Sequence, residues 1–226
     1  MSECQVLQNS ECRPESLRYH DDRNGRDRWP RHFHVVARPV HTDGSVMSIN
    51  VRELAGRLKG GDRRSLGKSG EVVEAVAETP ALFADLFECL FDADPLVRMR
   101  AADAAEKASR DRPQLLQPWK AALLERISAL PQKEVRWHVA QMLPRLSLTA
   151  GERETAVGIL MGYLADESSI VKTSGMQALA DLASHDLANH DERLRAQVIP
   201  LIERLIRTGT PAMKSRGRKL LKKLTR

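Results

Sequence analysis

Four stretches of this chain superimpose on one another, and this internal repeat constrains the fold more than any other feature. Val97, Val135, Val171 and Met213 occupy equivalent positions, with spacings of 38, 36 and 42 residues. A cation follows each of them, and apolar or small residues recur four, seven, eight and eleven positions later. These offsets lie on one stripe of an α-helix. Repeats of this length are typical of helical solenoids.

A second apolar stripe precedes each of these helices. Its residues stand eleven and eight positions before each reference position: Leu86 and Cys89, Leu124 and Ile127, Leu160 and Tyr163, and Ile202 and Leu205. Between the two stripes, Asp94, Ser168 and Thr210 are good helix N-caps. Pro95 and Pro211 follow at the first helical position, where the missing N–H costs nothing. Each unit is therefore predicted to be two amphipathic helices joined by a short turn.

Segments 92–98 (Asp-Ala-Asp-Pro-Leu-Val-Arg) and 166–172 (Asp-Glu-Ser-Ser-Ile-Val-Lys) resemble the turn between the two helices of a HEAT repeat. That turn has an acidic residue ahead of it and a Val-Arg pair opening the second helix. The resemblance covers about residues 54–224. From residue 47 onward, the chain is also similar to small single-domain bacterial HEAT proteins without an assigned activity. Such similarity implies binding of a partner without naming it.

In HEAT repeats, the acidic and basic turn positions form a ladder through the stacked units. By this resemblance, Asp92 would pair near Arg98, and Asp166 near Lys172. Two cations would need other partners, because Leu130 and Thr208 stand at the acidic position of their units: Arg136 and Lys214.

The expected fold class is all-α, with an architecture of stacked antiparallel helix pairs in a HEAT/armadillo-like α-solenoid. Stacking is needed because one helix pair cannot bury its apolar stripe alone. The expected helices span 50–58, 69–78, 80–91, 95–110, 115–129, 133–147, 150–165, 168–184, 191–207 and 211–224.

The first part of the chain differs from the rest. Residues 1–46 contain seven acids and seven arginines without helical periodicity, and they are expected to be disordered. Residues 47–226 are expected to form the solenoid. The working protein is expected to begin at Met47, with the preceding segment an over-extended start or a dispensable arm.

Composition predicts a cytoplasmic protein without a membrane anchor. No apolar run approaches the roughly 20 residues of a membrane span, and the N-terminus has no apolar signal segment. Three cysteines do not make a disulfide framework, which favours a reducing compartment.

No catalytic residue, metal or cofactor is predicted, and the protein is expected not to be an enzyme. The stretch 61–69 resembles a phosphate-binding loop but places five residues between its glycines instead of four. A zinc site was considered for the N-terminal histidines and cysteines, but their spacing matches no usual ligand pairs: Cys4, Cys12, His32, His34 and His41.

Charge is concentrated at the C-terminal end. The net charge is +6, yet the last 23 residues contain nine cations and no acid. A basic terminal helix can attract nucleic acid, an acidic protein or an anionic surface. The same helix can also serve only as a polar cap of the solenoid, with cations near a helix C-terminus.

Two functions compete. The leading hypothesis is a monomeric, non-enzymatic scaffold or adaptor that binds another protein through the surface of its repeats. Its candidate contact residues are Arg100, Trp137, His138, Met176, Lys214, Arg216, Arg218 and Lys222.

The alternative is nucleic-acid binding through the basic C-terminal helix. Resemblance to HEAT-like DNA glycosylases would give Trp137 the aromatic role and Asp103 or Asp181 the carboxylate role. For Trp137, packing between repeats is the competing interpretation.

Overall fold

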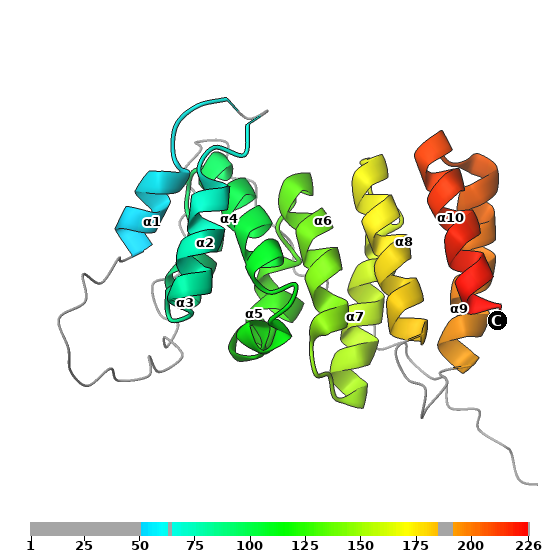
Figure 1. Ribbon diagram of the computed structural model, residues 1–226. Helices are drawn as coiled ribbons and strands as arrows, with labels where there is room; N and C mark the ends of the chain where they lie inside the picture. The colour runs from blue at the N-terminus through cyan, green and yellow to red at the C-terminus, as the bar shows by residue number, and fades with distance from the viewer. Residues whose placement is uncertain (1–50, 63–64, 185–191, 226) are drawn as a thin grey trace, which may run out of the picture. The chain divides into compact units, whose positions relative to one another are not determined.

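The computed structural model describes residues 51–62, 65–184 and 192–225, and none of these residues forms a β-strand (Figure 1). Residues 45–226 form one compact unit. The expectations of disorder over 1–46 and of a start at Met47 lie outside the described residues. Within those residues, the chain is all-helical, as expected.

The described helices follow the repeat closely. They are α1 (Val51–Leu58), α2 (Ser69–Glu78), α3 (Leu82–Glu88), α4 (Pro95–Ala108), α5 (Lys120–Ala122), α6 (Lys133–Met142), α7 (Ala150–Tyr163), α8 (Ser169–Ser184), α9 (Glu192–Thr208) and α10 (Pro211–Leu224). Short 3₁₀ turns extend α3 over Cys89–Phe91 and α6 over Leu143–Arg145.

The α-helix expected over residues 115–129 is wrong, because this segment is not one regular α-helix. The segment 115–129 is a 3₁₀ turn over Pro113–Trp119, the short α5, and a π-helical turn over Leu123–Ile127. Pro118 lies inside this 3₁₀ turn and has no N–H to donate, so it interrupts the α-helical hydrogen bonds. Pro200, by contrast, lies within a continuous α9.

The helices pack in sequence along the unit. Helix α2 packs against α4, α4 against α6, α6 against α8, and α8 against α10. In addition, α3 packs on α4, α7 on α8 and α9 on α10. Helices α1, α2 and α3 lie at one end of this unit, and α9 and α10 lie at the other (Figure 1).

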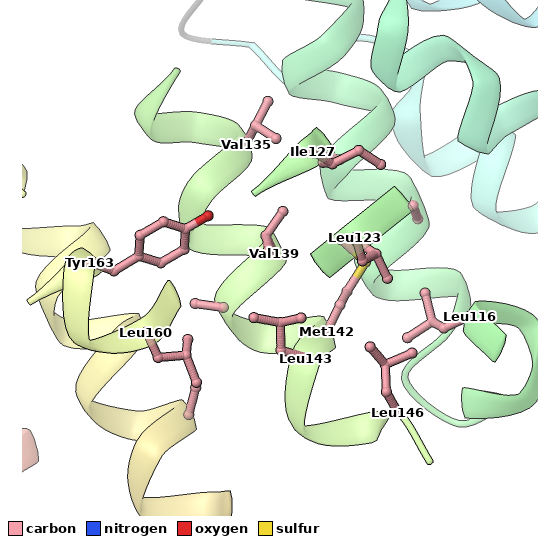
Figure 2. Close-up of a cluster of buried hydrophobic side chains, with 14 of the residues drawn as sticks. Leu116, Leu123, Ile127, Val135, Val139, Met142, Leu143, Leu146, Leu160 and Tyr163 are labelled. Carbon is pink, nitrogen blue, oxygen red and sulfur yellow. The ribbon is translucent and has the colours of Figure 1, made fainter. Parts of the chain in front are cut away.

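The matched positions form the core. Val97, Val135, Val171 and Met213 are all buried. Figure 2 shows how the two stripes meet: Leu123 and Ile127 of the π-helical turn approach side chains of α6, and residues of α7 flank α6 on its other side. Tyr163 donates from its hydroxyl to the Ser128 carbonyl at 2.9 Å, so this ring is buried without leaving its polar atom unsatisfied.

Small residues set the closest helix approach. A Cβ added to Gly217 of α10 would stand 2.6 Å from Cγ1 of Ile206 in α9. The equivalent positions are Ala101 in α4 and Gly175 in α8, both buried. In these three units, the small side chain four residues after the reference position therefore lets the two helices pack closely, whereas α6 has Val139 at this place.

The predicted caps form at two of the turns. Asp94 Oδ1 accepts from the Leu96 N–H at 2.8 Å, and Thr210 Oγ1 accepts from the Met213 N–H at 3.4 Å. An unforeseen capping box starts α7, where Thr149 and Glu152 bond each other's backbone N–H.

The turn ladder connects successive units in addition to the expected contacts within a unit. Lys172 lies near enough to Asp166 for its charge to lower the pKa of that carboxyl, as expected. Arg136 Nη1 lies 2.7 Å from Asp166 Oδ2 in the next unit. Arg98 donates Nε to Gln132 Oε1 at 3.0 Å and Nη1 to the Asp92 carbonyl at 2.8 Å. Arg98 thus lies near Asp92 as expected, but it binds the backbone oxygen and not the carboxylate.

Candidate docking surface

The structure divides the predicted contact residues into three groups. Arg100, His138 and Met176 are buried, with exposed fractions of 1%, 8% and 0%. Trp137 and Lys214 are half-buried. Three cations of α10 are exposed: Arg216, Arg218 and Lys222.

Arg100 is the clearest correction to the expected surface. Its guanidinium donates to the carbonyl oxygens of Leu58, Gly60, Asp62 and Ser65 at 2.6 to 3.2 Å. These bonds hold the loop after α1 against α4. Arg100 is therefore committed within the fold and does not lie on the surface to which the sequence assigned it.

Gly67 makes room for this arginine. Its φ is +54°, and a Cβ there would stand 2.7 Å from Arg100 Cζ. The glycine thus allows the backbone to approach the guanidinium, to which the carbonyl groups of Asp62 and Ser65 also bind.

Met176 is buried for a different reason. It lies on α8 five residues after Val171, and α8 packs between α6 on one side and α9 and α10 on the other. The equivalent Ala102 and Ala140 are buried as well. The offset of five residues therefore marks an interface between successive units in α4, α6 and α8.

His138 lies beside acidic and basic residues of α4. Burial lowers its pKa to about 4, while Asp103 and Glu106 act to raise the pKa and Lys107 and Arg110 act to lower it. Its Nδ1 is buried without a hydrogen-bond partner among the described residues. The imidazole is consequently neutral at pH 7.

Trp137 stands next to this histidine on α6. The two rings meet edge to face, with centroids 5.4 Å apart. The half-buried indole therefore combines the packing role with a partly accessible edge.

An inner polar strip crosses α4, α6, α8 and α10, and we define it by Asp103, Glu106, Arg145, Gln177, Asp181, Arg216 and Lys223. Its first part links α2, α4 and α6. Asp103 accepts from Ser69 Oγ at 3.0 Å and from Lys107 Nζ at 2.7 Å. Glu106 binds Arg110 at 2.8 Å and also Arg145 of α6.

Glu106 stays ionised in this position. Burial opposes its charge, but hydrogen bonds from Arg110 and Arg145 and the charges of both arginines outweigh that cost and lower its pKa. Arg145 also donates to the Glu106 carbonyl at 2.9 Å. The negative charge of Glu106 is thus balanced by the two arginines that bind it.

The second part of the strip links α8 and α10. Gln177 Nε2 donates to both oxygens of Asp181 at 3.0 Å. Arg216 Nη1 reaches Gln177 Oε1 at 2.9 Å, and Lys223 Nζ reaches Asp181 Oδ1 at 3.2 Å. Acids and amides of α8 therefore hold the cations of α10 in place.

A groove of about 450 Å³ opens along the strip between α6, α8 and α10. Polar side chains dominate its lining: Gln141, Arg145, Ser174, Gln177, Asp181, Ser184 and Lys223. Such a lining offers both hydrogen-bond donors and acceptors to an incoming chain. Among the residues that the structure describes, no group of three or more His, Cys, Asp or Glu side chains could hold a metal ion.

Sequence reasoning missed most of this strip. The sequence did contain one indication of the strip. Ten residues after each reference position, every unit carries a charged residue: Lys107, Arg145, Asp181 and Lys223. An offset of ten stands on the side of the helix away from the core stripe, so a charge at that position is compatible with a solvent-facing surface.

No family model, curated protein or solved structure matches this chain. Over the described residues, no helix is long and apolar enough to cross a lipid bilayer. The fold and the strip together define an all-helical protein with an open polar surface.

Proposed function

We propose that residues 51–225 form an α-solenoid of the HEAT type. Two observations support this architecture. Successive helix pairs are connected by a turn ladder that includes Arg136 and Asp166, and the repeat positions are buried in each of the four units. Ladder contacts between successive turns are what the resemblance implies for HEAT repeats.

We further propose that this protein is a non-enzymatic scaffold or adaptor that binds another protein along the inner polar strip. The observation that carries the proposal is the continuity of the strip over four helices, with an open groove along it. A surface built from successive repeats suits an extended segment, because each repeat can contact a few residues of the bound chain.

The chemistry of the groove selects the kind of segment. Arg145 and Lys223 line it as cations, and Gln141 and Gln177 line it as amides. The extended segment that fits best has carboxylate side chains and free backbone amide groups. We place this interaction in the cytoplasm of a bacterium, in line with the HEAT resemblance.

The ion pairs of the strip do not favour the glycosylase-like alternative. Asp103 is bound by Lys107 and Ser69, and Asp181 is bound by Lys223 and Gln177. Both carboxylates are thus already engaged by neighbouring side chains. Trp137 packs on His138, so its face is only partly available for a base.

Site-specific photo-crosslinking tests the docking proposal. A crosslinker placed at Gln177 in the groove is expected to capture a defined protein in cells. The matched control is a crosslinker at Thr155, which is exposed on α7 and lies outside the groove lining. Capture at Gln177 should disappear in an Arg145→Glu, Lys223→Glu background. Equal capture from both positions, or capture that survives the double reversal, would reject the groove as the docking site.

A second candidate function is nucleic-acid binding, favoured by the nine cations without an acid in the last 23 residues. Binding of this kind weakens steeply with salt, because each contacted phosphate releases counterions. A gel-shift titration with single-stranded and duplex DNA at low salt distinguishes it from protein docking. A retarded band that disappears in the Arg216→Glu, Arg218→Glu variant would favour nucleic acid over a protein partner.

A further inference from the structure

In α4, α6 and α8, the second helix of each unit, certain positions are buried although they lie outside the core stripe. Five residues after each reference position stand Ala102, Ala140 and Met176, and all three have exposed fractions of 0%. Nine residues after the reference position, Glu106 and Ala180 are buried too, at 2% and 0%. In the second unit, the residue at this offset is Pro144, which is half-buried and lies in the turn after α6. In α4 and α8, both offsets are covered by neighbouring helices.

The turn cations show the same direction. Arg98 donates to Gln132 of the following unit, and Arg136 pairs with Asp166 of the following unit. Both arginines stand one residue after their reference positions. The side of α4 and of α6 that carries this arginine is thus the side on which the next unit packs.

In α10, the same three offsets carry Lys214, Arg218 and Lys222. Arg218 and Lys222 are exposed and Lys214 is half-buried, and within the described residues no ion pair neutralises any of the three. We call these three residues the basic end face. It has the position of a repeat interface, but it presents cations where α8 has Met176 and Ala180.

One stretch at the other end has the opposite charge, next to α1, which carries Arg52 and Arg57. Residues 69–91, which include α2 and α3, contain five acids and no cation. Glu71, Glu74 and Glu78 are exposed on one side of α2, at spacings that place them on the same helical stripe. Within the part of the chain that the structure describes, Glu71 alone of the three has a cation within 4 Å, Lys68 at 3.6 Å, and both side chains of this pair are more than half exposed. We call Glu71, Glu74 and Glu78 the acidic stripe.

We propose that the basic end face docks on the acidic stripe of a second copy of this chain, head to tail. The charge complementarity between the basic end face and the acidic stripe identifies the occupant, and the offsets identify the face that receives it. Such a contact joins different surfaces of the two copies, so it builds open chains or closed rings of protein molecules. Under this proposal the protein is not the monomer that the sequence analysis expects.

The proposal is independent of the docking groove. Arg216 and Lys223 bind residues of α8, whereas the basic end face uses the cations at the other offsets. One surface can therefore fail its test without affecting the other. Exposed charge pairs are screened by salt, so the association should be strongest at low ionic strength.

Sedimentation velocity on nuclease-treated, full-length protein tests the proposal at about 20 mM and about 500 mM salt, where the screening length falls severalfold. The wild-type protein is expected to form species larger than the monomer at low salt and to dissociate at high salt. In the Arg218→Glu, Lys222→Glu variant, the apparent dissociation constant should rise more than about tenfold, because like charges then face each other.

A charge swap makes the test specific. The Glu74→Lys, Glu78→Lys variant should also be monomeric at low salt, and an equimolar mixture of the two variants should recover the large species. A Lys133→Glu, Arg207→Glu variant is the matched control, since it makes the same change in net charge at exposed positions of α6 and α9. It should associate like the wild type.

Three outcomes would overturn the proposal. They are a monomeric wild-type protein at low salt, large species that persist in either end variant, and a mixture of the two variants that stays monomeric. Recovery in the mixture also shows that both variants are folded, because an unfolded variant could not restore assembly.

Discussion

Arg136 and Asp166, thirty residues apart in the sequence, meet at 2.7 Å between Nη1 and Oδ2 and connect two successive helix pairs. Arg136 also donates Nε to the Leu130 carbonyl at 2.8 Å. Asp166 Oδ1 accepts from the Ser168 N–H at 2.8 Å, which shapes the turn before α8. This ion pair therefore holds two turns and the contact between them together.

Removing the acid from this pair should destabilise the protein. Burial opposes the charge of Asp166, but bonds from Ser168 and Arg136 lower its pKa overall. Asp166→Ala should cost about 1–3 kcal/mol in the free energy of unfolding, because Arg136 loses a charged partner that is largely buried. Urea denaturation measures this. Glu71→Ala, which removes an exposed pair, should change stability little.

The lowered pKa of Asp166 also gives its effect a pH dependence. The unfolded chain binds a proton at higher pH than the folded protein does. The stabilisation is therefore present above the unfolded pKa and is lost as the pH falls below it. The difference between wild type and Asp166→Ala should shrink below about pH 4, near the ordinary pKa of an aspartate. A difference that stays constant down to pH 3 would contradict this account.

Arg100 should be among the most sensitive residues in the chain. Replacing it with Met keeps much of the volume but leaves the carbonyl oxygens of the 58–65 loop without their donor. We expect a loss of about 3–5 kcal/mol, comparable to breaking a buried charged network. Hydrogen exchange should show faster exchange in α1 and the loop that follows. An Arg52→Met control, at an exposed site of α1, should leave both measurements unchanged.

Leu143 tests the core stripe. It is fully buried and lies among residues of α6, α7 and the π-helical turn (Figure 2). Leu143→Ala should lower the free energy of unfolding by about 2–5 kcal/mol, through lost burial and the remaining cavity. Leu66→Ala is the control, because that side chain is 48% exposed. Equal thermal stability of the two variants would argue against the placement of this stripe in the core.

His138 should make the protein sensitive to mild acid. Its pKa is lowered to about 4 by burial, so between about pH 6.5 and pH 4 the unfolded chain binds a proton that the folded protein excludes. Stability contributed by the neutral imidazole is thus present above pH 6.5 and falls as the pH decreases through this window. The loss is on the order of 3 kcal/mol at pH 4.

The variant His138→Gln isolates this effect because it cannot titrate. Its free energy of unfolding should depend less on pH between 6.5 and 4 than that of the wild type. Asp103, Glu106, Lys107 and Arg110 surround the site in both proteins, so their contributions cancel in the comparison. Parallel pH profiles of the two proteins would show that His138 is not the group responsible.

Much of the local structure could be predicted from the repeat. Helices α2 and α10 begin and end where the periodicity placed them, and the four reference residues are buried. The segment 115–129 could not be predicted this way, because its apolar spacing is helical while Pro118 interrupts the hydrogen bonds. The inner polar strip was partly visible as the charge at offset ten, but nothing in one sequence indicates which of these charges pair.

The amino-acid sequence by itself determined the helices, their caps and the apolar stripes, because these depend on residues within three or four positions of one another. Tertiary structure alone decided that Arg100 and Met176 are buried while Arg218, at the same offset as Met176, is exposed. The physical reason is that burial depends on the neighbouring unit. Two residues at equivalent places in the repeat have the same helical environment, but only the packing of distant helices determines which of them meets protein and which meets water.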